Sequence, residues 1–224
     1  MSTLNPEKKM YSDKMLAIAG VPPRYLNHSF SNFSASGSTL KALEVAREWA
    51  ELKTPKDRGF MLLGDPGVGK THLAVAALRQ LAGLWSEERN KEVDPDAYVD
   101  LSAAVERKMR FVNAPILLDG LRESIRVSDH PAHDLYKYCL KSASVVVIDD
   151  FGKEKATDWA SERLYVLIES RYQNLLSTIV TSNRTLDELD DLGYGAAVSR
   201  LQETGRSVRI DGKDKRPELG AKSR

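Results

Sequence analysis

The chain contains the sequence Gly64-Asp65-Pro66-Gly67-Val68-Gly69-Lys70-Thr71, which matches the phosphate-binding pattern G-x-x-x-x-G-K-[ST]. A short apolar run typical of a buried strand precedes it, and apolar residues at helical spacing follow it. In such a loop the backbone amides and the helix N-terminus attract phosphate groups. We therefore expect a nucleotide site that also includes His72, with Lys70 at the terminal phosphates and the Thr71 hydroxyl toward Mg²⁺.

The spacing of the glycines separates this loop from the dinucleotide-binding loop of Rossmann domains. The glycines fall as G-x-x-G-x-G, and Lys-Thr follows them where a Rossmann loop places a further glycine inside the helix. A chance match to a glycine-rich turn is the alternative, but the strand before the loop and the helix after it make that alternative weak.

Outward from the loop, the remaining pattern alternates between strands and helices. Further strands are expected at 111–112, 145–148, 179–180 and 208–210, and helices at 40–49, 73–81, 116–125, 135–140 and 157–174. The run 145–148 is β-branched throughout, as expected for a central parallel strand covered on both faces. The alternation predicts an α/β fold in which a parallel five-stranded sheet lies between helices.

Polar residues follow two of these strands. Asp149 and Asp150 end the run 145–148, and open α/β sheets bind ligands at the carboxyl ends of their strands. We expect Asp149 to hold Mg²⁺ and Asp150 to polarise the attacking water. Asn183, after the next strand, would lie beside the γ-phosphate, unless it only caps the helix that begins near Thr185. This arrangement suits the additional-strand class of ATPases better than small nucleotide kinases.

Composition sets limits on the partners and the environment. The 224 residues carry 33 Lys and Arg against 32 Asp and Glu, so no broad basic surface indicates nucleic acid. The charge is segregated, with a net −3 in residues 85–108 and +4 in residues 206–224. A single cysteine, Cys139, is expected in the core and fits a reducing compartment. No apolar stretch is long enough for a membrane span, so we expect a cytoplasmic protein.

Several linked motifs, in order, resemble the AAA+ ATPases of the DnaC/DnaI helicase-loader type and their IstB-type transposition relatives. The resemblance covers roughly residues 20 to 216 and is carried by these segments: Gly20-Val21-Pro22-Pro23-Arg24-Tyr25 with Phe30 and Phe33, Gly64 to Ala74, Phe111-Val112-Asn113-Ala114, Val147 to Gly152, Thr181-Ser182-Asn183, Ser199-Arg200-Leu201 and Gly212-Lys213-Asp214-Lys215-Arg216.

The resemblance implies roles for residues that pattern alone leaves open. Asn183 matches sensor 1, Arg200 matches the arginine finger that completes a neighbouring subunit's ATP site, and Arg216 resembles the terminal arginine that acts like sensor 2. Without the family, Arg200 is a solvated helix residue and Arg216 is part of a basic tail. The family lacks the usual helical lid, so the expected fold is an AAA+ P-loop domain with no separate lid.

The resemblance also implies domain boundaries. We expect a short N-terminal lead at 1–20, which is a candidate helicase-contact segment because loaders of this type normally use a longer N-terminal region for that purpose. The AAA+ domain would span 21–216 with an acidic insertion at about 85–108, which is a candidate partner-binding hairpin, and a basic tail would span 217–224.

Loaders of this type hold single-stranded DNA at the centre of a spiral, with contacts from a hydroxyl and from aromatic residues near the acidic strand. The matching positions here are Tyr136, Thr157 and Trp159, and Lys153 and Lys155 could contact phosphates. Core packing is the competing interpretation for Tyr136 and Trp159.

The leading hypothesis from sequence is an ATPase that requires ATP and Mg²⁺, oligomerises on single-stranded DNA and helps load a hexameric replicative helicase. A transposition helper with a transposase as its partner shares the same ATP site. A nucleotide-gated DNA-binding module with little hydrolysis is a third reading, favoured if Asp150 is too short to reach the water. A metabolic phosphotransferase is a fourth, although no separate acceptor-binding lid is visible in the sequence.

Overall fold

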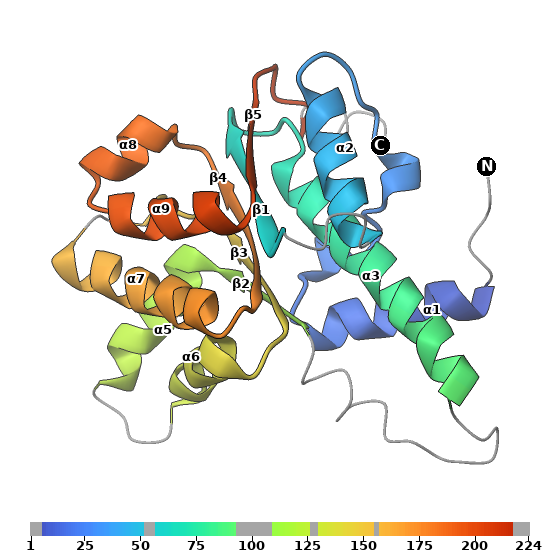
Figure 1. Ribbon diagram of the computed structural model, residues 1–224, viewed down its shortest axis with the longest axis horizontal. Coiled ribbons are helices and arrows are strands. Elements are labelled where there is room, and N and C mark those ends of the chain that lie inside the picture. Colours follow the sequence, from blue (N-terminus) through green and yellow to red (C-terminus); the bar gives the residue numbers. More distant parts are fainter. Residues whose placement is uncertain (1–5, 52–56, 93–108, 126–129, 155–156, 217–224) are drawn as a thin grey trace.

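A computed structural model describes residues 6–51, 57–92, 109–125, 130–154 and 157–216 of the chain. Its centre is a five-stranded sheet in the order β2-β3-β4-β1-β5, and every neighbouring pair of strands is parallel. Helices cover both faces of the sheet (Figure 1). The expected α/β architecture with five parallel strands between helices is confirmed.

Each strand is built on apolar residues, which are adjacent in four of the strands and alternate with polar residues at 206–210. The strands are β1 (Gly59–Gly64), β2 (Met109–Asn113), β3 (Val145–Asp149), β4 (Ser177–Ser182) and β5 (Arg206–Ile210). All residues of β1 and β3 are buried, because helices pack on both faces of these strands. Successive side chains in a strand point to opposite faces, so Phe60 and Leu62 enter one core while Met61 and Leu63 enter the other.

One face of the sheet is covered by α1 (Pro6–Ile18), α2 (Thr39–Ala50) and α3 (Lys70–Glu92). The helix α1 packs against α3, and it buries Met15, Leu16 and Ala19 in the core of this face. Two short 3₁₀ turns, Pro23–Tyr25 and Phe30–Asn32, connect α1 to α2. The helix α3 continues through residues 85–92 of the expected acidic insertion, and residues 93–108 lie outside the described part of the chain.

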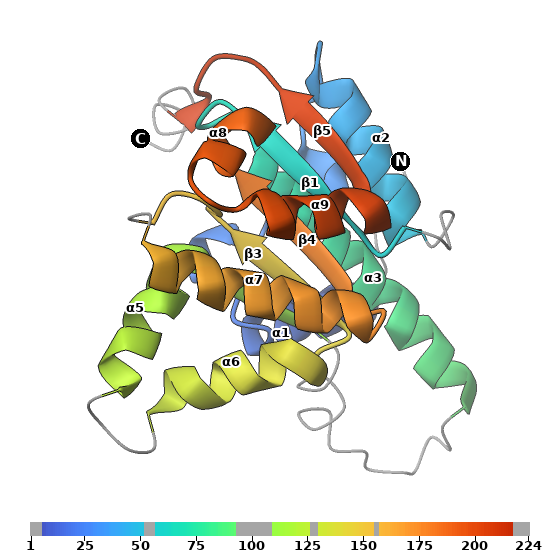
Figure 2. The ribbon, with the colours of Figure 1, turned by 60° about the vertical axis from the view of Figure 1, so that its left-hand side comes forward.

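The opposite face is covered by α5 (Ala114–Ser124), α6 (Pro131–Lys141), α7 (Asp158–Gln173), α8 (Leu186–Asp191) and α9 (Gly195–Thr204), as Figure 2 shows. Cys139 is fully buried in this core, as expected, and burial raises the pKa of its thiol to about 11. Among the helices of the described residues, none combines the length and apolar character needed to cross a membrane.

The strand order determines where the polar strand ends meet. Because β4 lies between β1 and β3, the carboxyl ends of these three strands are neighbours at one edge of the sheet. Gly64 ends β1, Asp149 ends β3 and Ser182 ends β4. The strand between β1 and β3 is β4, whereas the strand expected at 111–112 is β2 and lies at the edge of the sheet. The position of β4 brings the ends of β3 and β4 beside the phosphate loop.

Candidate nucleotide site

The phosphate loop joins β1 to α3 and adopts a backbone that favours glycine. Gly67 and Gly69 have φ angles of 74° and 104°, in the region that residues with a Cβ rarely adopt. A Cβ on Gly67 would clash with the side chain of Asp214, and one on Gly69 would lie 2.6 Å from the ring of Phe33. Segments from both ends of the chain therefore pack against the loop and require glycine at these positions.

Lys70 is the first residue of α3, and its side chain returns to the loop. Its Nζ donates hydrogen bonds to Gly64 O at 2.7 Å and Asp65 O at 2.6 Å, and the residue is only 7% exposed. Burial lowers the pKa of Lys70 to about 8; the negative charge of Asp150 opposes this shift and the positive charge of Arg216 adds to it. Arg216 thus contributes charge at the phosphate loop, although its side chain remains 64% exposed.

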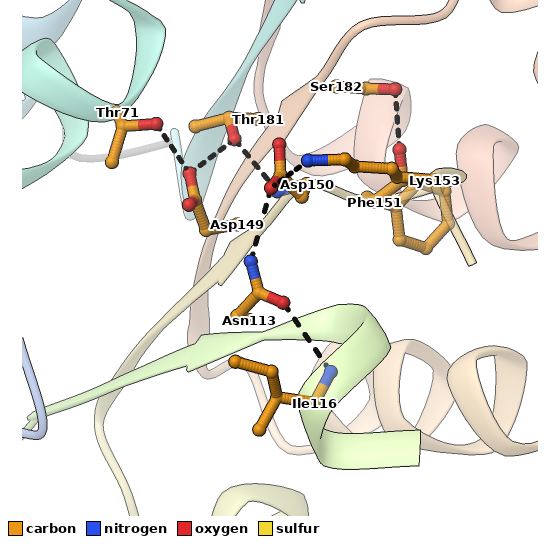
Figure 3. Close-up of polar contacts among 9 residues, drawn as sticks. All are labelled: Thr71, Asn113, Ile116, Asp149, Asp150, Phe151, Lys153, Thr181 and Ser182. Atoms are coloured by element: carbon orange, nitrogen blue, oxygen red, sulfur yellow. Dashed lines mark hydrogen bonds and ion pairs between the residues drawn. The ribbon is translucent and has the colours of Figure 1, made fainter. Parts of the chain in front are cut away.

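Asp149 connects the loop helix to the sheet. Its Oδ1 accepts a hydrogen bond from Thr71 Oγ1 at 2.8 Å and another from Thr181 Oγ1 at 2.7 Å (Figure 3). The residue is 3% exposed, and burial raises the pKa of its carboxyl, while the two hydroxyl donors oppose that shift. The structure therefore brings together Thr71 and Asp149, the two residues that the sequence assigns to a metal ion.

Asp150 has an unusual backbone, with a φ angle of 60° that non-glycine residues seldom adopt. Its backbone N–H donates to Thr181 Oγ1 at 3.1 Å. Its Oδ2 accepts hydrogen bonds from Asn113 Nδ2 at 3.2 Å and from Lys153 Nζ at 3.0 Å (Figure 3). Thr181, Asn113 and Lys153 thus hold Asp150 in this conformation. Strained backbone that surrounding contacts hold in place is characteristic of functional sites.

These residues fit a nucleotide with Mg²⁺. Mg²⁺ prefers hard oxygen ligands and usually takes one or two carboxylates together with substrate phosphates. Thr71 and Asp149 supply a hydroxyl and a carboxylate 2.8 Å apart at the start of a helix. Among the described residues there is no cluster of three or more His, Cys, Asp or Glu side chains that could hold a metal ion without such phosphates.

The segment before α2 packs beside the loop through two stacked histidines. The rings of His28 and His72 lie 4.1 Å apart and nearly parallel, and His72 Nε2 lies 3.0 Å from both Ser29 O and Asn32 Oδ1. Burial lowers the pKa of His28 to about 4 and also lowers the pKa of His72. The side chain of His72 thus holds the N-terminal segment in place.

The segment after β5 covers the other side of the loop. Gly212 N donates to Asp65 Oδ2 at 3.2 Å, and Lys215 N donates to Gly67 O at 3.2 Å. Lys215 Nζ also donates to Ser34 O, so this segment joins the loop to the N-terminal segment. Of the other loop residues, Val68 is buried in the core beneath α2 and α3.

Asn183 and Arg200 occupy different surroundings. Asn183 directly follows β4, and the cap of α8 is Thr185, which accepts from Glu188 N; the alternative capping role of Asn183 is therefore excluded. Arg200, on α9, pairs with Glu169 at 2.8 Å, and its guanidinium lies over the ring of Tyr172 at 4.9 Å. These partners belong to α7 rather than to the phosphate loop, so Arg200 lies outside the cluster around Asp149.

The residues expected to contact DNA differ in their surroundings. Tyr136 is 6% exposed and donates its hydroxyl to Arg163 O at 2.7 Å, so the structure corrects the expectation of a stacking surface there: this side chain belongs to the core. Burial raises the pKa of Tyr136 to about 12. Lys153 is exposed but paired with Asp150. Lys155 lies outside the described residues.

Thr157 and Trp159 lie at the start of α7. Thr157 caps this helix by accepting from Ala160 N at 3.2 Å, and it also accepts from Arg122 Nη2 at 3.5 Å. The guanidinium of Arg122 lies over the partly exposed Trp159 ring at 5.0 Å. Arg122 was not identified from the sequence, because nothing in the pattern of α5 indicates that it lies over α7.

Sequence reasoning also assigned no separate role to Thr181 and Asn113. Thr181 donates to Asp149 and accepts from the Asp150 backbone, and Asn113 donates to Asp150 while its Oδ1 accepts from Ile116 N. Both residues lie at the ends of strands next to β3, and their position at strand ends was the available signal.

Comparisons with known proteins agree with this geometry. No protein-family model matches the chain. YqaM of Bacillus subtilis (strain 168) is 25% identical over 205 residues, which are 86% of this chain and 57% of YqaM. The replicative helicase loader DnaC of Escherichia coli (strain K12) is 25% identical over 191 residues, which are 85% of this chain and 69% of DnaC.

A crystal structure of the DnaC helicase loader superimposes with a TM-score of 0.64 at 27% sequence identity, covering 84% of this chain and 99% of that structure. The chain spans about 57 to 61% of the length of the first curated relatives it matches. The phosphate loop, the strand order and these similarities agree with one another: in sequence and in fold, the chain is similar to the AAA+ helicase loaders of the DnaC type.

Proposed function

We propose that the chain binds ATP with Mg²⁺ at the loop 64–71, hydrolyses it, and acts as a loader that assembles on single-stranded DNA and helps place a hexameric replicative helicase. The proposal that the chain binds a nucleotide rests on the Asp149 carboxylate, which accepts hydrogen bonds from Thr71 at the start of α3 and from Thr181 in β4. The similarity of the chain to DnaC-type helicase loaders supports the loader part.

Each side chain has a role in this proposal. Lys70 moves from the loop carbonyls to the terminal phosphates, and Thr71 and Asp149 hold the metal ion. When bound, Mg²⁺ supplies charge neutralisation at the phosphates. Asp150 orients the attacking water, Asn183 lies beside the γ-phosphate, and Arg216 adds positive charge near Lys70.

Arg200 acts in this proposal on the ATP of a neighbouring subunit. Its partners in its own chain, Glu169 and Tyr172, support a position away from its own phosphate loop. A cation contributed by a second subunit stabilises the charge that develops on the transferred phosphoryl group. Turnover in the proposed assembly therefore requires contact between subunits.

Mixing two inactive variants tests this arrangement. We expect Arg200→Ala and Lys70→Ala each to lose ATP turnover, and an equal mixture to recover about a quarter of the wild-type rate, because in a head-to-tail assembly about one interface in four joins an intact loop to an intact arginine. Phosphate release with single-stranded DNA present measures the rate. Arg163→Ala, at a partly exposed arginine of α7, is the matched control. A mixture as inactive as its components, or full activity in a monomeric preparation, contradicts the role of Arg200.

Capture from the native host identifies the partner. The full chain, immobilised with ATP, is expected to retain a replicative helicase, and the Lys70→Ala variant is expected to retain much less. Recovery of a transposase in place of a helicase would overturn the loader function in favour of the transposition-helper function. Mass spectrometry of the retained proteins distinguishes these results.

A second candidate function follows from the surroundings of Asp150. Asn113 and Lys153 both donate to its Oδ2, so a water molecule must compete with two donors for this oxygen. That arrangement favours a nucleotide-gated DNA-binding module with little hydrolysis. Strong DNA binding that depends on ATP, with negligible turnover even when DNA and partner are present, would select this function over the ATPase.

A further inference from the structure

Lys153 is tied to Asp150 by a short turn. Lys153 N donates to Asp150 O at 3.2 Å, and its Nζ donates to Asp150 Oδ2 at 3.0 Å. Gly152, with a φ angle of 77°, allows the backbone to reverse between them. The ammonium group thus stays next to the carboxylate while the backbone remains in place (Figure 3).

Solvent exposure of the side chains decreases from Lys153 to Asp149, one of the two residues assigned to the metal ion. The side chain of Lys153 is 59% exposed and that of Asp150 is 27% exposed, whereas Asp149 is 3% exposed. An ion pair at the surface is weak and exchanges readily with other ions, because water and salt screen it. A phosphate arriving from solvent can therefore take the ammonium group of Lys153 without any change in the buried part of the site.

A second cation, Arg122, contacts the start of the helix that follows Lys153 in the chain. Thr157 follows Lys153 by four residues, and its hydroxyl accepts from Arg122, whose guanidinium covers Trp159. A partly exposed aromatic ring covered by one cation, in the segment that follows a second exposed cation, suits a chain of phosphates with unpaired bases, because the bases stack on flat surfaces and the phosphates pair with the cations. These features favour single-stranded DNA over a free phosphate as the competing anion.

We propose that Lys153 is a positioning residue whose ammonium group keeps Asp150 Oδ2 in an ion pair. This pair lasts until a phosphate of single-stranded DNA binds the ammonium group instead. Release of Lys153 leaves Asn113 as the remaining side-chain donor to Oδ2 and allows water to approach this oxygen. The inference rests on the proposed ATPase function and adds to it the route by which bound DNA affects hydrolysis.

The test compares the full wild-type chain with Lys153→Gln and Lys153→Arg. Lys41→Gln removes an exposed lysine on α2 whose pair with Glu44 is far in sequence from the site, and it serves as the matched control. ATP turnover is measured with Mg²⁺, with and without oligothymidylate, and DNA affinity is measured by fluorescence anisotropy over a range of salt concentrations.

Lys153→Gln is expected to raise turnover without DNA by up to about fivefold, the effect of losing one exposed ion pair, and to bring the stimulation by DNA close to one. The slope of log affinity against log salt should fall by about 0.7, as expected for one lost phosphate contact with single-stranded DNA. Lys153→Arg should restore the low basal rate and the stimulation, and Lys41→Gln should match the wild type.

Unchanged or reduced basal turnover in Lys153→Gln with normal stimulation by DNA would overturn the proposal. Wild-type turnover that depends on Lys70 but ignores the oligonucleotide would also overturn it, while leaving the ATPase function standing. Absence of turnover in every variant would instead refute the proposed function. In that case the salt dependence of DNA affinity still tests Lys153. An unchanged slope in Lys153→Gln would also refute the contact between Lys153 and DNA phosphate, and a reduced slope would support it.

Discussion

Replacing Asp149 with asparagine is expected to lower Mg²⁺-dependent ATP turnover roughly 100-fold, equivalent to about 2.7 kcal/mol of transition-state stabilisation, and to leave the protein at least as stable as the wild type. Asparagine keeps the shape of the side chain and one carbonyl oxygen to accept from Thr71 and Thr181. It removes the negative charge that a divalent ion requires. Steady-state phosphate release and thermal unfolding, measured on the same preparation, check the two parts.

The expected stability follows from the burial of Asp149. A carboxylate that is 3% exposed is held charged at a cost, which the raised pKa of this group reflects. A neutral amide in the same position removes that cost and loses little hydrogen bonding. Active sites commonly gain stability when a functional charge is neutralised.

The control for this prediction is Thr181→Val, which removes the hydroxyl that donates to Asp149 and accepts from the Asp150 backbone. It should reduce turnover less than Asp149→Asn does, because the carboxylate itself remains. A clear loss of thermal stability in Asp149→Asn would mean that the residue supports the fold rather than the chemistry. Wild-type turnover in Asp149→Asn would remove it from the metal site altogether.

Most of the fold was predictable because burial on both faces of a parallel sheet leaves a strong local pattern. The run Val145 to Ile148 contains only β-branched apolar residues, and all of β3 is buried. The same reasoning located the other four strands. The extent of α3 was less predictable: the sequence becomes polar near Trp85, yet the helix continues to Glu92, because a helix that projects beyond the sheet needs no apolar face.

For the candidate site, too, the sequence located the residues of local motifs and missed those that act through long-range contacts. The phosphate loop and Asp149 belong to contiguous motifs, so local sequence located them. Thr181, Asn113 and Arg122 act through contacts with residues 32, 37 and 35 positions away in the chain. Those contacts depend on the order of strands in the sheet and the packing of helices, which sequence spacing does not specify. The sequence left Tyr136 open between a stacking surface and core packing for a similar reason: an aromatic residue on a helix has the same local pattern whether it faces solvent or core.

Arg171 offers the largest expected effect on stability. Arg171→Met is expected to lower the free energy of unfolding by about 3 to 5 kcal/mol, because the buried guanidinium is replaced by a side chain that donates no hydrogen bonds. Arg171 is fully buried, and its guanidinium donates to Thr178 Oγ1 and to the carbonyl oxygens of Cys139, Ala143, Ser144 and Ser177. Burial lowers its pKa to about 10, so it remains charged at neutral pH. Urea unfolding followed by circular dichroism measures the change.

The partners of Arg171 explain why this effect should extend to the nucleotide site. Ser144 and Ser177 adjoin the starts of β3 and β4, and these two strands end at Asp149 and Ser182. A loss of register at their starts would move Asp149 relative to Thr181, so Arg171→Lys, which retains the charge with fewer donors, should lose less stability and keep turnover. Arg163→Met, at a partly exposed arginine of the same helix that pairs with Glu162, should change stability by less than about 1 kcal/mol. If Arg171→Met unfolds at the wild-type urea concentration, the five hydrogen bonds contribute no net stability, and the strand starts must be held by apolar packing alone.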